Sequence, residues 1–162
     1  MTLLASGSIG ATGLTLSSIS GSYEQLFLKL MDVVPSVSTG MGLRFNSDTG
    51  GNYASFANFQ SSSSYVTEAS GSGTRVGLQY EVFSTTANGA IVTCLLNNYS
   101  DTIGYKQFVA QSGFLDNPAT RPTTVYRVGS WLNENAITSI NFFADAGGSF
   151  ITSGSYELWG IK

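Results

Sequence analysis

Histidine is absent from the 162 residues, and only 10% of them are charged. Histidine is the commonest metal ligand and general base in proteins, because its pKa lies in the physiological range. Any active site would have to use ten carboxylates, seven basic groups and one thiol. The sequence also lacks the nucleophile elbow, the P-loop and the His-Glu-x-x-His motif. We therefore expect no enzymatic activity, no cofactor and no bound metal.

Cysteine occurs once, as Cys94, so an intrachain disulfide is excluded. The residue lies in the apolar run 91–96 and is expected to be a small buried hydrophobe. A nucleophilic thiol would need a neighbouring base, and no histidine is present to serve as one.

Basic residues are few, and the net charge is −3. Nucleic-acid binding needs a basic surface that displaces counterions from phosphates, and anionic membranes also attract basic segments. No apolar run approaches the roughly 18 residues of a membrane-spanning helix. The first residues show no basic region followed by an apolar segment, so no secretory signal is expected. The predicted protein is made in a cytoplasm and binds neither nucleic acid nor membrane.

Apolar and polar residues alternate along most of the chain, which is typical of strands with one face in a core. In Gln25–Val33, for example, Leu26, Leu28 and Leu30 share a face. Strands are predicted at Gly13–Ile19, Gln25–Val33, Met41–Asn46, Tyr53–Gln60, Val76–Val82, Ala90–Asn97, Tyr105–Gln111, Thr123–Trp131, Ala136–Ala144 and Ser155–Ile161.

Helix patterns are nearly absent, and short strands alternate with Gly, Asn and Asp turns such as Asn88-Gly89. The predicted fold is all-β, a two-sheet antiparallel β-sandwich of jelly-roll type with about 8–10 strands. Residues 14–162 would form this single domain. Residues 1–13 would be an N-terminal arm on a neighbour or a disordered end. The serine-rich stretch Ser61–Gly73 is expected to be a long surface loop.

Four side chains are candidates for contact with a partner. Phe27 and Met31 make the second face of Gln25–Val33 partly apolar, so another element or subunit is expected to cover it. Tyr65 and Tyr99 lie in predicted loops, where an exposed ring would suit either sugar stacking or an oligomer interface. The sequence does not separate these two alternatives.

The oxygen spacing of Asn46-Ser47-Asp48-Thr49-Gly50 matches the front half of a calcium loop, but the distal bidentate acid is missing. An Asx turn that ends a strand is the favoured interpretation. A glycosidase needs two neighbouring acids, and the ten carboxylates are scattered without an obvious pair.

Several segments resemble small β-sandwich virion proteins of tailed bacteriophages, particularly cyanophage-like ones. These segments are Leu14–Leu26, Leu43–Tyr53, Asn97–Ser100, Trp131–Ile140 and the closing Leu158-Trp159-Gly160-Ile161. Together, and in this order, the segments cover most of the chain. The resemblance implies a structural protein of the virion without enzymatic activity, and it supplies no catalytic residues.

The first functional hypothesis is a capsid decoration or cement protein. It would form a trimer on the major capsid protein and stabilise the head through subunit contacts. The alternative is a tail-fibre or receptor-binding tip, in which the segments Ser61–Gly73 and Tyr99–Gly104 would recognise host surface glycans. The sequence contains no collagen-like or coiled-coil stem, which favours the first role.

Overall fold

The computed structural model describes residues 1–37, 39–61, 65–78, 89–115, 122–145, 148–150 and 154–162. Within these ranges it contains twelve strands and no α-helix. The strands are β1 (Thr2–Ser8), β2 (Leu14–Leu16), β3 (Gln25–Val33), β4 (Met41–Phe45), β5 (Tyr53–Ser61), β6 (Tyr65–Gly73), β7 (Val76–Gly77), β8 (Ala90–Asn97), β9 (Lys106–Leu115), β10 (Pro122–Trp131), β11 (Ile140–Ala144) and β12 (Ser155–Ile161).

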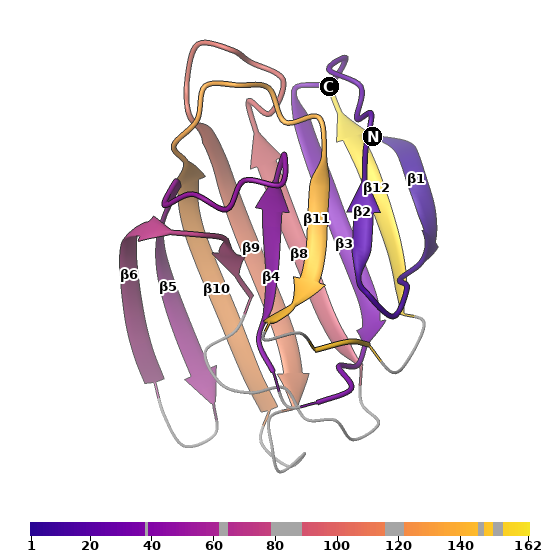
Figure 1. The fold of residues 1–162 in the computed structure, drawn as a ribbon, viewed down its shortest axis with the longest axis vertical. Coiled ribbons are helices and arrows are strands. Elements are labelled where there is room, and N and C mark those ends of the chain that lie inside the picture. Colours follow the sequence, from indigo (N-terminus) through magenta and orange to yellow (C-terminus); the bar gives the residue numbers. More distant parts are fainter. Residues whose placement is uncertain (38, 62–64, 79–88, 116–121, 146–147, 151–153) are drawn as a thin grey trace.

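The strands form two antiparallel sheets that pack as a sandwich, which confirms the predicted fold class. The large sheet has the order β1-β12-β3-β8-β9-β10-β5-β6, and the small sheet has the order β2-β11-β4-β7. Figure 1 shows the small sheet across the middle of the large one, while β1 on one side and β5 and β6 on the other extend past it. One face of the large sheet is therefore covered by the small sheet. We call it the inner face, and we call the opposite face the outer face.

Alternation on the long strands explains the core. Leu26, Leu28 and Leu30 of β3 are at most 1% exposed and point to the inner face. Across the core, Phe45 of the small sheet contacts Phe108 and Trp131 of the large sheet, with ring centroids 6.2 and 6.0 Å apart. Burial of such side chains contributes roughly 1.5–3 kcal/mol each, and it fixes which face of every strand points inward.

Two predicted irregular segments are strands, so both expectations were wrong. Residues 1–13 are not an arm, because β1 pairs with β12 at one edge of the large sheet and Ile9 is buried. Residues 65–73 of the predicted loop Ser61–Gly73 instead form β6, which pairs with β5 along nearly its whole length at the other edge, and residues 62–64 lie outside the described residues. Both β1 and β6 are edge strands made mainly of small residues, and only a few of their side chains, such as Leu4, Ala5 and Val66, pack against the core.

The other differences concern strand ends. Residues 14–16 replace the predicted strand 13–19, and β11 begins at residue 140 rather than 136. Only Val76 and Gly77 of the predicted strand 76–82 are assigned to a strand, and residues 79–82 lie outside the described residues. Asn88 of the predicted hairpin turn also lies outside them.

Cys94 is buried on the inner face of β8, as predicted. Its burial raises the pKa of the thiol to about 12, so the thiolate is not populated at neutral pH.

Candidate functional site

The outer face of the large sheet is not covered by any described strand, and its side chains form ordered rows. Antiparallel pairing places directly opposed residues side by side on one face. One row crosses all eight strands and is apolar throughout. It consists of Leu3, Trp159, Phe27, Leu95, Val109, Val128, Phe56 and Ala69. We call it the apolar row.

The next row along the strands is polar. It consists of Ser6, Glu157, Lys29, Thr93, Gln111, Tyr126, Asn58 and Thr67. The charged pair of this row, Glu157 and Lys29, lies on β12 and β3. From β8 to β6, the outward side chains that the structure describes are all uncharged.

A groove of about 610 Å³ lies over the uncharged part of the polar row and over the row that follows it. Its described lining comes from five neighbouring strands and comprises Asn58, Gln60, Tyr65, Ile91, Thr93, Gln111, Ser112, Gly113, Thr124, Val125 and Tyr126. Gly113 leaves the floor open between Ile91 and Thr124, its partners on β8 and β10. A Cβ atom added at Gly113 would have only Ile91 Cγ2 within 4 Å, at 3.6 Å.

The groove offers hydrogen-bonding groups beside aromatic rings. The amide groups of Gln60 and Gln111 each supply a donor and an acceptor, and the lining threonines add hydroxyls. The Oδ1 atom of Asn58 is buried and accepts no hydrogen bond. The residues Tyr126 and Tyr65 are 43% and 64% exposed, which makes them candidates for stacking with a ligand. This combination suits a polyhydroxylated ligand with an apolar ring face.

The structure brings one of the four predicted contact residues into this groove. Tyr65 lies on the groove at the start of β6, although on a strand and not in a loop. Phe27 belongs to the apolar row, and Met31 lies on the outer face of β3 opposite Ser155 of β12. Both are partly exposed, so they lie on the second, partly apolar face that was expected for Gln25–Val33. Whether another subunit covers this face stays a prediction.

Tyr99 was expected to be exposed and is instead fully buried. Asn98 has a φ of 54°, in the left-handed region that Asn tolerates, and the following Tyr99 packs in the core. The Tyr99 hydroxyl donates to the Ser20 carbonyl and accepts from the Tyr23 amide at 3.3 Å. Burial raises the pKa of Tyr99. The two hydrogen bonds of its hydroxyl connect the buried ring to Ser20 and Tyr23.

Sequence reasoning missed the amides and Tyr126 of the groove. Asn58, Gln111 and Tyr126 are adjacent in space only through the pairing of β5, β10 and β9. Each occupies an outward position of an alternating strand, and this alternation was the one available signal. The pairing register that unites them was not predictable from spacing.

The predicted Asx turn at Asp48 is confirmed. Asp48 Oδ1 accepts from the Gly50 amide at 2.8 Å, and Oδ2 accepts from Asn52 Nδ2 at 2.9 Å and Trp131 Nε1 at 2.7 Å. Burial raises the pKa of Asp48, but these hydrogen bonds outweigh it, so the net shift is downward. The carboxylate oxygens of Asp48, which the calcium-loop spacing singled out, therefore stabilise a turn and accept a hydrogen bond from the Trp131 indole.

Within the described ranges, no group of three or more Cys, Asp or Glu side chains is placed to hold a metal ion. The same ranges contain no helix with the length and apolar character of a membrane span.

Comparison with known proteins gives a distant structural likeness. No protein-family model and no curated protein sequence matches the chain. It is similar to the galectin LEC-6 of Caenorhabditis elegans, at 12% identity over 95% of each chain with a TM-score of 0.40. It is also similar to scytalido-glutamic peptidase, at 13% identity over 94% of this chain and 75% of that one with a TM-score of 0.23. Neither likeness extends beyond the fold, and the resemblance to phage virion proteins stays a prediction.

Proposed function

We propose that this protein is a non-enzymatic module that binds a neutral glycan in the groove of its outer face. The observation that carries the proposal is the row of amide, hydroxyl and tyrosine groups that five paired strands align in one groove. Side chains on paired strands are held more firmly than those on loops, so the groove needs little ordering before it binds.

The lining chemistry favours hydroxyl groups over charged or purely apolar ligands. None of the groove residues that the structure describes carries a charge, so an ionic ligand would lose its hydration without gaining a counter-ion. An apolar ligand would desolvate the amides of Asn58, Gln60 and Gln111 and leave them unpaired. Sugar hydroxyls both donate and accept, which matches side-chain amides, and the carbon face of a pyranose suits the tyrosine rings.

The same lining supports binding without turnover. The described groove residues include no carboxylate and no thiol, and the Cys94 thiol is buried on the opposite face. General acid–base or nucleophilic hydrolysis of a glycosidic bond needs such groups within hydrogen-bond reach of the substrate.

The biological setting that fits this activity is the receptor-binding tip of a phage tail or tail fibre. Single-site affinity for a neutral sugar is weak, because most hydrogen bonds to it replace bonds to water. Display as a homotrimer would multiply the binding through avidity. The proposed location is therefore the virion surface, with a host surface glycan as partner.

The test is a glycan-array and calorimetric comparison of the purified chain with two variants. Tyr126→Ala removes a ring in the groove. Tyr105→Ala removes a ring of similar exposure (53%) that does not line the groove. We expect Tyr126→Ala to weaken binding about tenfold or more and Tyr105→Ala to leave it unchanged. Absence of binding to any neutral glycan would refute the proposal.

A second candidate, the capsid decoration protein, is favoured by the apolar row. Eight aligned apolar side chains on an uncovered face are what a subunit contact would bury, and Leu3 and Phe56 are each 46% exposed. For this role we expect a trimer in sedimentation, and stoichiometric binding to phage heads whose resistance to heat falls when the protein is omitted. Phe27→Ser should break such a trimer while leaving glycan binding by the groove unchanged.

A further inference from the structure

A second hollow, of about 190 Å³, lies on the inner side of the large sheet where β5 and β6 extend past the small sheet. Its described lining is Ser55, Glu68, Ser70, Gly73, Thr74, Arg75, Gly77 and Arg127. We call it the arginine cleft. It faces away from the glycan groove, since Arg127 alternates with Tyr126 along β10.

Arg127 is the central side chain of the arginine cleft. It is only 4% exposed, yet its neighbours on the adjacent strands are Ala57 and Ala110. Nη1 donates to Ser55 Oγ at 2.8 Å, and Nη2 lies 3.2 Å from Glu68 Oε2. The buried Nε–H has no acceptor. A guanidinium has five N–H donors, and these contacts use two of them.

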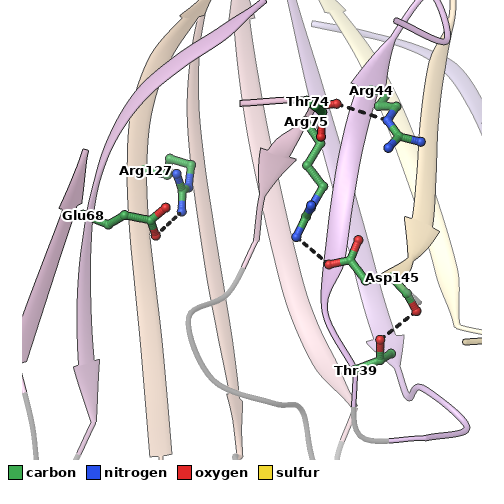
Figure 2. A network of polar contacts seen from close by, with 7 residues as sticks. All are labelled: Thr39, Arg44, Glu68, Thr74, Arg75, Arg127 and Asp145. Atoms are coloured by element: carbon green, nitrogen blue, oxygen red, sulfur yellow. Dashed lines mark hydrogen bonds and ion pairs between the residues drawn. The ribbon is translucent and has the colours of Figure 1, made fainter. Parts of the chain in front are cut away.

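Arg75 brings a second cation to the same hollow, from the segment between β6 and β7. Its Nη2 is 2.6 Å from Asp145 Oδ2, and its buried Nε–H also has no acceptor. Figure 2 shows Arg127 paired with Glu68, and Arg75 with its guanidinium directed toward Asp145. Of the described lining residues, Arg75 and Arg127 are positively charged and Glu68 is negatively charged, while Asp145, the partner of Arg75, lies outside the lining.

Folding alone does not account for this arrangement. Burial of a charged group is costly unless partners replace its hydration. Ser55, Glu68 and the ring of Phe59, whose centroid lies 5.6 Å from Arg127 Cζ, replace part of it, but the buried Nε–H is left without an acceptor. Burial lowers the pKa of Arg127 despite the opposing charge of Glu68. Unsatisfied buried donors in a native protein call for a water or an ion that completes them.

We propose that the arginine cleft binds a small oxyanion, a carboxylate or a phosphate group, between Arg75 and Arg127. Guanidinium groups recognise such anions through paired, charge-assisted hydrogen bonds. The hydroxyls of Ser55, Ser70 and Thr74 line the same space and supply neutral donors. The volume equals about six water molecules at roughly 30 Å³ each, which admits a phosphate or a carboxylate with its hydration but not a sugar chain.

Glu68 is the internal competitor for this anion. Its side chain is 44% exposed, and it meets Arg127 through a single oxygen at 3.2 Å. A partly exposed ion pair of this kind contributes little to stability, so an entering anion can displace it. Removal of the Glu68 charge should therefore strengthen anion binding, whereas a purely structural ion pair would only lose stability.

The test titrates the full chain with inorganic phosphate and, separately, with acetate, at constant ionic strength with chloride as the balancing ion. The readouts are the NMR signals of the arginine Nε–H groups and the midpoint of thermal unfolding. We expect saturable shifts of the Arg75 and Arg127 signals with one of the two anions, which identifies the anion, and a rise in the midpoint.

Three variants and one control make the assignment specific. Glu68→Gln should tighten anion binding several-fold, and Arg127→Gln should weaken it about tenfold or more. Ser70→Leu should block the cleft while both arginines stay in place, which covers the case in which Arg127→Gln fails to fold. The control is Arg44→Gln, because Arg44 stacks on Phe143 and donates to Thr74 O without lining the cleft. Linear, non-saturable shifts with both anions, or unchanged binding in Ser70→Leu, would overturn the proposal.

Discussion

The inner and outer faces of the large sheet are built by the same strands, yet they differ in almost every property. On β8, inner Val92, Cys94 and Leu96 are at most 1% exposed, whereas outer Ile91 is 49% exposed. The inner face is apolar over most of its area because the small sheet packs on it. The outer face instead sorts its residues into rows, one apolar and the next polar, and from β8 to β6 the described residues of the polar row are uncharged.

This difference separates the residues that specify the fold from those left available for binding. A one-residue slip in pairing would exchange the two faces of a strand, so the inner leucines fix the register. The outer residues then inherit that register without contributing much to it. Variants that make the same kind of substitution on the inner and on the outer face test this separation directly.

The largest effect is expected for truncation on the inner face. Leu96→Ala should destabilise the protein by about 2–5 kcal/mol, because it leaves a cavity under the small sheet. Ile91→Ala, on the outer face of the same strand, should cost less than about 1 kcal/mol. Urea unfolding of the two variants measures both values. Equal losses would mean that the outer face is also packed against something in solution.

The addition of a methyl group, at Gly129 on the inner face or Gly113 on the outer face, tests the same difference by adding atoms instead of removing them. The Cβ of Gly129→Ala on the inner face would lie 2.3 Å from Ala54 O and 2.7 Å from Phe108 Cζ, so a loss of about 1–3 kcal/mol is expected. The Cβ of Gly113→Ala would make only an ordinary van der Waals contact, with Ile91 Cγ2 at 3.6 Å, so stability should change by less than about 1 kcal/mol.

A larger side chain at the same outer position should affect binding alone. Gly113→Leu should keep the unfolding free energy near that of the native chain, since its side chain enters the groove. It should abolish glycan binding by filling the floor. Native glycan affinity in Gly113→Leu would place the ligand elsewhere.

Acid should weaken the hydrogen bond that Trp131 Nε1, on the inner face, donates to the carboxylate of Asp48. The folded pKa of Asp48 is depressed, so the stability from its hydrogen bonds is complete above the unfolded value near 3.8 and is lost as the pH falls through the lower folded value. Asp48→Asn should lose about 1–2 kcal/mol at neutral pH and flatten this acid dependence. Unfolding of the native chain and of Asp48→Asn, followed by tryptophan fluorescence at neutral pH and from pH 2 to 6, measures the loss of stability and its acid dependence. An unchanged acid profile in Asp48→Asn would assign the dependence to other carboxylates.

The contrast between the faces also explains what the sequence could predict. Alternation with a strong inner face, as in Leu26, Leu28 and Leu30, located most strands and the sandwich. β1 and β6 consist mainly of small residues and pair at sheet edges, so no long apolar period marked them. Tyr99 was misplaced because its hydroxyl bonds to Tyr23 and Ser20, 76 and 79 positions away in the chain, and no local pattern marks these contacts.

The groove was inaccessible to sequence reasoning for a related reason. Thr93, Gln111, Tyr126 and Asn58 come together through three strand pairings, and their order in space follows the sheet and not the chain. The arginine cleft was missed because buried cations with alanine neighbours leave no periodic pattern. Both sites depend on the pairing register, which the core fixes only when all strands are assembled.

The smallest expected effect is the response of the two sites to salt. Glycan affinity should change less than about twofold between about 0.05 and 0.5 M NaCl, because the described lining of the outer groove carries no charge for salt to screen. Anion affinity of the arginine cleft should fall measurably over the same range, because chloride screens and competes for Arg75 and Arg127. Calorimetry of the same protein sample measures both. Glycan binding that weakens with salt would place charged residues at the ligand and move the site off the uncharged half of the outer face.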